Sequence, residues 1–306
     1  MTVTETNPEV VVLLYYKYVP IENAEEFAKQ HLDYCKSIGL LGRIIVAKEG
    51  INGTVSGTKE LTDSYIEYMH SDPKFADMEF KVELYQKHPF KKMHVRPKSE
   101  IVNLGRPDID PNVVTGIYLE PEEFKNMIET DPDIVILDTR NNFESAIGKF
   151  KGAITPDIDH FRDFPDYVKT LDVPKDKKIL AYCTGGIRCE KATGVLLEAG
   201  YKHVYQLHGG IIRYGQLTGG PHWEGKCYVF DGRISVVVNQ FEDTVISQCS
   251  HCKTASDRYI NCTNPMCNKQ IIVCENCETE IFHACSKECA EHPKARWREQ
   301  EKFQTV

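Results

Sequence analysis

Apolar residues in the first third of the chain follow two different spacings. Four short runs rich in β-branched and aromatic residues predict strands: residues 10–19, 42–50, 53–57 and 80–88. Two segments with apolar residues at helical spacing predict helices: residues 23–39 and 59–72. The order strand, helix, strand, strand, helix, strand is that of a ferredoxin-like βαββαβ domain. We place the turn between the middle strands at Asn52 and Gly53, because this dipeptide suits the positive φ of a tight turn.

The middle of the chain has apolar strands that alternate with helices. The predicted order is a helix, a strand, a strand, a helix and a strand, at residues 121–129, 134–140, 177–183, 189–200 and 203–209. Such alternation indicates a parallel α/β sheet. A hairpin is expected next, over residues 223–238, and eight of the twelve cysteines follow within residues 248–292. The expected domains are therefore residues 1–105, 106–220 and 221–306.

Composition narrows the class of protein. The chain has 306 residues, enough for two or three cores, and no apolar run approaches the roughly 18 residues of a membrane span. Its N-terminus lacks the features of a signal peptide, so we expect a cytoplasmic protein with no membrane partner. In a reducing compartment, twelve cysteines favour metal ligation or thiol chemistry over disulfides. The net charge of -8 argues against a protein that binds nucleic acid through its overall electrostatic field, but a local basic patch is still compatible with it.

One turn concentrates the candidate chemistry. Cys183 ends a buried strand, where open α/β sheets bind their ligands. Gly185 and Gly186 allow the following N–H groups to form an anion-binding nest at the start of a helix. These dipoles and Arg188 should lower the pKa of the Cys183 thiol. The alternative is that Cys183 is a small buried apolar residue. Cys189, in the first helical turn, is equally consistent with a resolving thiol or with simple packing.

Three stretches around this turn resemble a rhodanese domain: IVILDTRNNFESAIGKFKGAI, CTGGIRCEKA and GYKHVYQLHGGI. The resemblance implies that the loop cysteine carries a persulfide and that the loop backbone cradles the sulfur. The residues of this loop beyond the cysteine and the arginine are Thr184, Gly185, Gly186, Ile187 and Cys189. The C-x4-R spacing is one residue shorter than that of cysteine phosphatases, so a smaller ring favours sulfur over phosphate and disfavours a phosphatase.

The order of parts along the whole chain resembles the oxygen-dependent tRNA uridine hydroxylase family. The matching features are KEGINGTVSG in the first domain, CTGGIRCEKA in the second, YVFDGR after it, and the cysteine-rich tail. The resemblance implies conversion of the wobble uridine to 5-hydroxyuridine, with molecular oxygen as co-substrate and the anticodon loop of tRNA as partner. We expect Cys183 and Arg188 to be catalytic. No flavin or nicotinamide motif is seen, so the electron donor is unknown.

Two other functions compete with this one. In a sulfurtransferase, a Cys183 persulfide would pass its sulfur to a thiol acceptor without any RNA. In a non-enzymatic adaptor, the zinc-stapled tail would bind RNA or protein while the rhodanese loop is idle. The presence of the cysteine, both glycines and the arginine argues against an idle loop.

A basic stretch supports an RNA partner. Residues 84–99 contain no acidic residue and five cations: Lys87, Lys91, Lys92, Arg96 and Lys98. Their interleaving with Tyr85 and Phe90 suits phosphate contacts combined with stacking on exposed bases. The alternative is an ordinary solvated edge.

The tail carries four close cysteine pairs, which would supply the ligands of two tetrahedral zinc sites. The eight residues are Cys249, Cys252, Cys262, Cys267, Cys274, Cys277, Cys285 and Cys289. The 21-residue gap between the two C-x2-C pairs is near that of a zinc ribbon and is consistent with joining the first pair with the third and the second with the fourth, but sequential pairing stays open. Disulfides and a redox role are the alternatives to zinc. His251 and His283 are expected to be neighbours rather than ligands.

Overall fold

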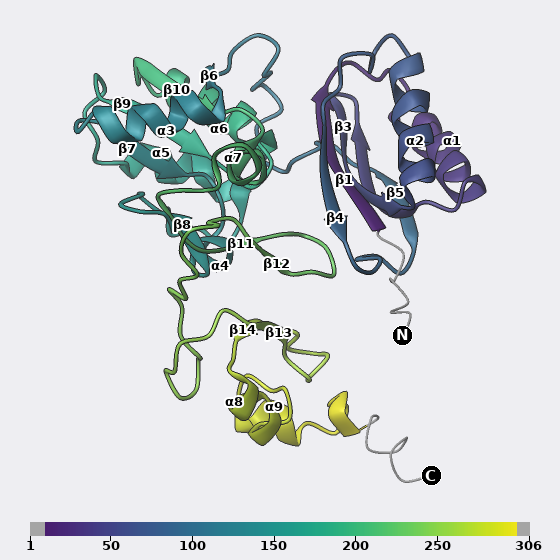
Figure 1. The fold of residues 1–306 in the computed structure, drawn as a ribbon, viewed down its shortest axis with the longest axis vertical. Helices are drawn as coiled ribbons and strands as arrows, with labels where there is room; N and C mark the ends of the chain where they lie inside the picture. Colours follow the sequence, from purple (N-terminus) through teal and green to yellow (C-terminus); the bar gives the residue numbers. More distant parts are fainter. Residues whose placement is uncertain (1–9, 299–306) are drawn as a thin grey trace, which may run out of the picture.

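The computed structural model describes residues 10–298, and Figure 1 shows its three parts. The first part has a five-stranded sheet and two helices. In chain order its elements are β1 (Val10–Tyr18), α1 (Ala24–Ser37), β2 (Leu41–Ala47), β3 (Gly50–Gly57), α2 (Lys59–Ser71), β4 (Phe80–Tyr85) and β5 (Met93–Pro97). The sheet order is β4-β1-β3-β2-β5. Its first four strands have the predicted ferredoxin-like arrangement, and β5 is an additional strand parallel to β2.

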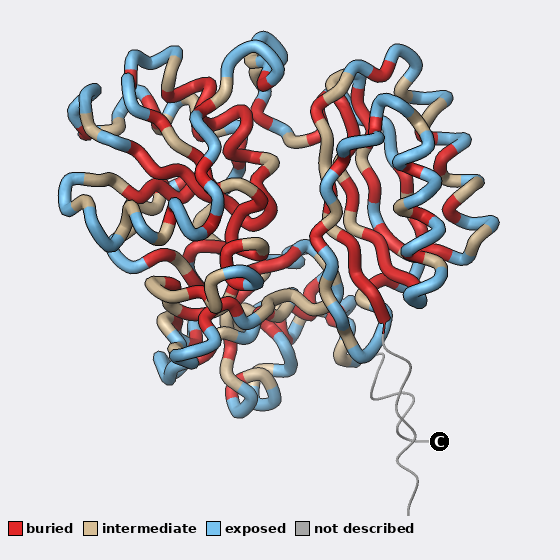
Figure 2. Tube along the Cα trace, turned by 45° about the horizontal axis from the view of Figure 1, so that its top comes forward, coloured by how far each residue is buried: buried red, intermediate tan, exposed pale blue. Residues whose placement is uncertain are grey.

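The two faces of this sheet have different neighbours. Helices α1 and α2 cover the outer face, where Leu13, Tyr15 and Val55 belong to a buried core. The other face is turned toward the second part of the chain (Figure 1). Along β1 the residues alternate between these faces, so Leu14, Tyr16 and Tyr18 lie on the face toward the second part. Figure 2 shows that the strands are mostly buried while the helices expose their outer sides.

The predicted hairpin exists, but the predicted turn is wrong. Ala47 pairs with Gly50, so the two turn residues are Lys48 and Glu49. Asn52 and Gly53 lie inside β3. A β-carbon at Gly53 would lie 2.5 Å from the Tyr15 ring, so this glycine makes room for a neighbouring aromatic side chain rather than for a turn.

The second part contains the predicted parallel sheet, with strand order β6-β10-β9-β7. Its elements begin with β6 (Ile117–Leu119), α3 (Pro121–Thr130), β7 (Val135–Asp138), α4 (Asn142–Ser145), β8 (Gly148–Phe150), η1 (Phe161–Asp163) and α5 (Phe164–Thr170). They continue with β9 (Lys178–Tyr182), α6 (Ile187–Glu198), β10 (His203–Leu207) and α7 (Gly210–Thr218). Helix α6 starts two residues earlier than expected, immediately after the glycine pair.

The expected hairpin after the parallel sheet is also present. Strands β11 (Trp223–Tyr228) and β12 (Ser235–Val237) pair in antiparallel fashion. Strand β11 pairs on its other side with β8. Trp223 and Cys227 share a buried core with Leu180 and Tyr182 of β9, so the hairpin packs directly against the parallel sheet.

The cysteine-rich tail is built on a second, smaller hairpin. Its elements are β13 (Tyr259–Asn261), β14 (Gln270–Ile272), α8 (Glu275–Glu280) and α9 (Lys287–Glu291). The Tyr259 hydroxyl donates a hydrogen bond to the Phe143 carbonyl at 2.5 Å, and Lys226 pairs with Asp257 at 2.7 Å. These contacts attach the tail to α4 and β11 of the second part. Within residues 10–298, no helix is long and apolar enough to cross a membrane.

Candidate active site and metal sites

Cys183 occupies the predicted position at the carboxyl end of β9. The Gly186 N–H donates to its Sγ at 3.2 Å, and Gly186 has φ +101, a conformation that other residues rarely adopt. The Cys183 carbonyl accepts from the Ile211 N–H of α7 at 3.0 Å. The loop is therefore held from both sides, with backbone donors directed at the sulfur.

The two loop thiols have opposite acidities. Burial alone would raise the pKa of Cys183, but a hydrogen bond from Cys189, the charge of Arg188 and loop N–H groups together lower that pKa to about 6. Burial and the neighbouring Cys183 raise the pKa of Cys189 well above its usual range. At neutral pH this arrangement favours a Cys183 thiolate beside a protonated Cys189.

Arg188 is part of a buried ion pair that the sequence analysis missed. Its guanidinium donates two hydrogen bonds to Glu144 of α4, at 2.6 and 2.7 Å. Both side chains are almost fully buried. Nothing in the spacing of Glu144 and Arg188 along the chain indicated this contact. Glu144 fixes the orientation of the arginine, and the arginine charge still acts on the nearby Cys183.

The first domain covers this loop. A β-carbon at Gly185 would lie 3.0 Å from Leu14, and one at Gly186 would lie 2.9 Å from the Tyr16 hydroxyl. Cys183 is fully buried as a result. The two glycines therefore serve a second purpose, because they allow the N-terminal sheet to approach the loop closely.

Polar contacts tie the two domains together around the start of α6. The Tyr16 hydroxyl donates to Glu190 at 2.8 Å, and the Tyr18 hydroxyl donates to the Ile187 carbonyl at 3.3 Å. Lys191 is fully buried and pairs at 2.7 Å with both Glu49, in the β2–β3 turn, and Glu100. Both domains therefore contribute residues around the reactive loop.

A cavity of about 420 Å³ lies between the domains beside this loop. Its lining includes Tyr16, Lys81, Tyr118, Glu190 and Gly209. Glu190 accepts hydrogen bonds from Tyr16 at 2.8 Å and from Tyr118 at 2.7 Å. Sequence analysis had not singled out these residues, because they come from five separate segments that only the domain packing brings together.

The basic stretch is exposed, but one of its predicted roles is wrong. The five cations Lys87, Lys91, Lys92, Arg96 and Lys98 are all exposed. None of them forms a salt bridge to another described residue. Phe90, however, is only 6% exposed and cannot stack on a base. Tyr85 is half-buried, with the Arg233 guanidinium 5.8 Å from its ring centroid. The stretch therefore offers charge without the expected aromatic platform.

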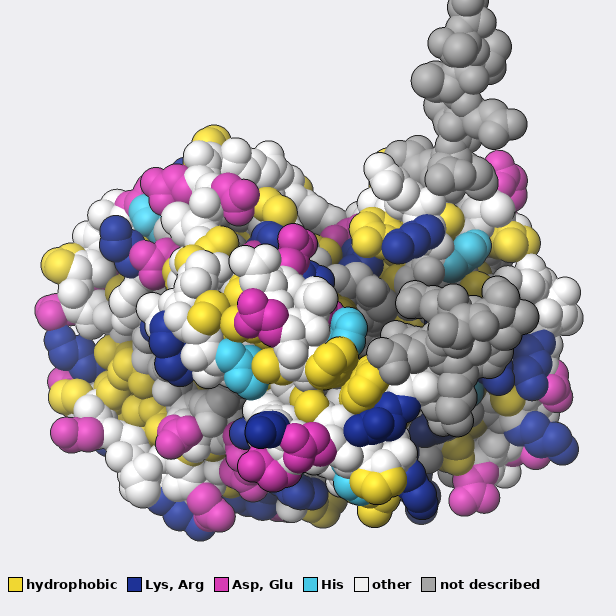
Figure 3. Space-filling view, turned by 90° about the horizontal axis from the view of Figure 1, so that it is seen from below, with side chains coloured by type: hydrophobic (Ala, Val, Ile, Leu, Met, Phe, Trp, Pro, Cys, Tyr) yellow, Lys and Arg dark blue, Asp and Glu magenta, His cyan; other side chains and the backbone are white. Residues whose placement is uncertain are grey.

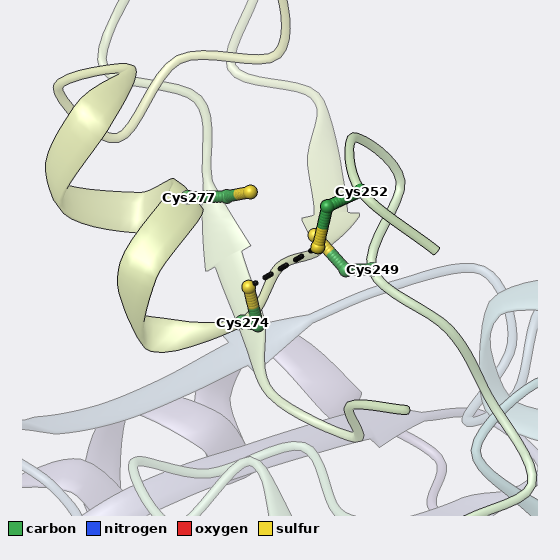
Figure 4. A group of neighbouring side chains, drawn as sticks. All are labelled: Cys249, Cys252, Cys274 and Cys277. Atoms are coloured by element: carbon green, nitrogen blue, oxygen red, sulfur yellow. Dashed lines mark hydrogen bonds between the residues drawn. The ribbon is translucent and has the colours of Figure 1, made fainter. Parts of the chain in front are cut away.

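The tail brings its cysteines into two groups of four. Cys249 and Cys252 meet Cys274 and Cys277, as Figure 4 shows. The second group is Cys262, Cys267, Cys285 and Cys289. Of the two arrangements that the sequence left open, this is the interleaved one. Its cause is the β13–β14 hairpin, since the second cysteine pair lies at the turn end of the hairpin and the first and third pairs lie at its open end.

The sulfur geometry of both groups fits a tetrahedral metal ion. Four thiolates at about 2.3 Å from zinc lie about 3.8 Å from one another. The Sγ atoms of Cys252 and Cys274 are 3.5 Å apart, and those of Cys267 and Cys285 are 3.6 Å apart. Within each group all four sulfurs lie within 4.8 Å. No cysteine among residues 10–298 forms a disulfide, and neither histidine named above belongs to a group.

Comparison with known proteins gives matches along almost the whole chain. Residues 10–101 match the UPF0176 acylphosphatase like domain, residues 120–216 the rhodanese-like domain, and residues 224–290 the family described as Rhodanase C-terminal. The chain is 56% identical over 290 residues to a Staphylococcus haemolyticus protein named tRNA uridine(34) hydroxylase, covering 94% of this chain and 90% of that protein. A protein of the same name from Cytophaga hutchinsonii is 51% identical over 285 residues, covering 93% and 91%.

Proposed function

Since the chain belongs to the tRNA uridine(34) hydroxylase family, we propose that it hydroxylates C5 of the wobble uridine with Cys183 as the reacting group. The protein is an enzyme, its substrate is tRNA, and its reaction consumes oxygen. The observation that supports Cys183 is the convergence of backbone donors, Arg188 and a protonated Cys189 on one buried sulfur. We expect the reaction to take place in the cytoplasm, because the substrate is tRNA.

The chemistry of uracil suggests how a thiolate activates C5. The Cys183 sulfur forms a bond to C6, the C5–C6 π bond breaks, and its electron pair moves toward the O4 carbonyl. C5 then becomes a nucleophile that can form a bond to one atom of molecular oxygen. The second oxygen atom leaves as water and takes up two electrons and two protons from a separate two-electron donor. Loss of the C5 proton and expulsion of the thiolate restore the C5–C6 double bond.

The residues around Cys183 suit this sequence of steps. The lowered pKa supplies the thiolate before substrate binds. The same N–H groups and the Arg188 charge stabilise the thiolate again when it leaves. In the related scheme that starts from a Cys183 persulfide, the same groups would stabilise the sulfane sulfur instead.

We infer that the tail binds two zinc ions with structural roles. Each group of four cysteines completes a tetrahedral site and leaves no ligand position for water, which is typical of structural zinc. When bound, the zinc ions would stabilise the fold of the tail by linking its cysteines. Tyr259 then supports Phe143, which directly precedes the arginine's partner Glu144 in α4.

We further propose that the exposed basic stretch contacts tRNA phosphates. Its unpaired lysines and arginine are free to release counterions when they meet RNA. Figure 3 shows a face on which Lys and Arg side chains are interspersed with Asp and Glu. A local patch must therefore supply the attraction, because the net charge of -8 does not.

The test is nucleoside mass spectrometry of tRNA from cells that lack the protein and receive one variant each. Wild type should restore 5-hydroxyuridine, and Cys183→Ser should not. Cys35→Ala is the matched control, because Cys35 is equally buried but lies in the core of the first domain. Wild-type amounts of 5-hydroxyuridine with Cys183→Ser would move the chemistry to another residue. Sulfur transfer to a small thiol, without any change in tRNA, would favour the sulfurtransferase.

A further inference from the structure

Lys81 is a largely buried cation that has no carboxylate partner among the described residues. It lies on β4 and is only 7% exposed. Its Nζ lies 5.1 Å from the centroid of the Tyr16 ring. Among residues 10–298, no carboxylate lies within 4.0 Å of this ammonium, and no hydrogen bond to it is formed. Burial lowers the pKa of Lys81 to about 8. An ammonium that is largely removed from water and has only the Tyr16 ring beside it is poorly compensated, so a ligand that accepts its hydrogen bonds would explain its position.

The cavity into which Lys81 faces has its other cations already paired. Arg213, which does not itself line the cavity, pairs with the lining residues Glu79 at 2.7 Å and Glu120 at 3.1 Å. His208 also contacts Glu120, at 2.6 Å, and Lys17 pairs with Asp77. Among the described residues that line the cavity, Lys81 is therefore the cation left for a ligand.

The negative charge of Glu190 on the cavity wall disfavours an anionic ligand. The Glu190 carboxylate has hydrogen bonds from two tyrosines but no cation within salt-bridge distance among the described residues. A phosphate would meet this negative charge, which no salt bridge to a described residue offsets. A neutral ligand with carbonyl acceptors and a flat ring would instead accept from Lys81 and pack against tyrosine rings. Uracil has these properties, and an unpaired anticodon loop can release it at a cost of about a few kcal/mol.

The cavity also reaches the reactive loop. Gly209 lines the cavity, and a β-carbon on Gly186 would lie 3.5 Å from the Gly209 nitrogen. Tyr16 is shared between the cavity wall and the cover over Gly186. Cys183 is fully buried and does not itself line the cavity, so attack on a base held here requires the Tyr16 side chain or the loop to move aside.

We propose that this interdomain cavity receives the flipped wobble uracil and that Lys81 donates a hydrogen bond to its O4 carbonyl. The proposal rests on the hydroxylase function given above. When the Cys183 sulfur adds to C6, the displaced electron pair gathers on O4, where a positioned ammonium stabilises it. Lys81 would then be a catalytic residue contributed by the first domain, which explains why the rhodanese loop is covered by a second sheet.

The first experiment compares Lys81→Met, Lys81→Arg and Lys29→Met in single-turnover hydroxylation of saturating tRNA. Lys29 is exposed on α1, far from the cavity, and its change should leave the rate unaltered. Loss of a charge-assisted hydrogen bond should slow Lys81→Met by about 10- to 100-fold. Lys81→Arg should recover part of the rate. The melting temperature of Lys81→Met should be at least that of wild type, because the change removes a buried unpaired charge.

The second experiment identifies the atom that Lys81 contacts. Anticodon stem-loop RNAs carry uridine, 4-thiouridine or 2-thiouridine at the wobble position, and each is tested with wild type and Lys81→Met. The rate ratio of the two proteins should shrink on 4-thiouridine, because sulfur is a poor acceptor, and stay unchanged on 2-thiouridine.

A wild-type rate in Lys81→Met would overturn the proposal, as would equal ratios on uridine and 4-thiouridine. If wild type hydroxylates no uridine at all, the proposed function fails and the role of Lys81 fails with it. If wild type is active and only the ratios are equal, the function stands and the cavity assignment falls.

Discussion

Replacing Glu144 by Gln should destabilise the second domain far more than an ordinary ion-pair mutation. Glu144 and Arg188 are almost fully buried and are joined by two hydrogen bonds of 2.6 and 2.7 Å. Removing one charge of a buried pair leaves the other uncompensated and costs about 3 to 5 kcal/mol. For a domain of this size, about 3 kcal/mol lowers the melting temperature by about 12 °C or more.

The matched control is Asp166→Asn, because Asp166 and Lys169 also lie 2.6 Å apart but are exposed. That change should leave the stability of the domain nearly unaltered, because solvent screens an exposed ion pair. The assay is denaturation followed by Trp223 fluorescence in a Trp297→Phe background, since Trp223 is buried in the core of the second domain.

A double variant separates stability from catalysis. Glu144→Leu combined with Arg188→Met removes both charges and should recover much of the lost stability, so the two single changes are not additive. Hydroxylation by the double variant should nevertheless be strongly reduced, because without the Arg188 charge the pKa of Cys183 rises. Two results would contradict this account of the buried ion pair. In the first, Glu144→Gln destabilises the domain no more than Asp166→Asn does. In the second, the double variant is destabilised by the sum of the effects of Glu144→Leu and Arg188→Met measured singly.

Three other properties follow from the site. The hydroxylation rate should rise with pH through about 6, because the Cys183 thiolate forms there, and a rise near the ordinary thiol pKa would contradict the lowered value. Purified protein should contain close to two zinc ions per chain by metal analysis; chelation should unfold the tail before the second domain and reduce hydroxylation, whereas metal-free protein with an intact tail would refute structural zinc. Changing Lys91, Lys92 and Arg96 to Glu should weaken tRNA binding and flatten its salt dependence in a filter-binding titration while leaving thiosulfate sulfurtransferase activity nearly unaltered, and an unchanged affinity would remove this surface from the account.

Local patterns predicted the elements of the fold and the reactive turn. Strand β9, Cys183, the glycine pair and α6 follow one another along the chain, so their geometry depends on neighbours in sequence. The first domain was also predictable, because each strand and helix has its own periodicity. The turn at Asn52 and Gly53 was predicted wrongly, because glycine also serves where a side chain such as that of Tyr15 needs space.

The remaining features depend on contacts between distant segments. Glu144 meets Arg188 across 44 positions, and Lys81 reaches the cavity only because two domains pack together. Phe90 has a basic neighbourhood in the sequence but a buried environment in the fold. The sequence left two pairings of the tail cysteines open, and the β13–β14 hairpin decides between them by placing the first and third pairs at one end.

The most direct test of the central claim is a covalent trap. The probe is an anticodon stem-loop RNA with 5-fluorouridine at the wobble position. A thiolate can attack its C6, but its C5 carries fluorine in place of the proton whose loss normally accompanies release of the enzyme. We predict a stable protein–RNA adduct whose peptide mass spectrum maps to Cys183, with none formed by Cys183→Ser and full yield from Cys35→Ala. An adduct at another residue, or hydroxylation of uridine by wild type with no adduct on the fluorinated RNA, would contradict attack of Cys183 on the base.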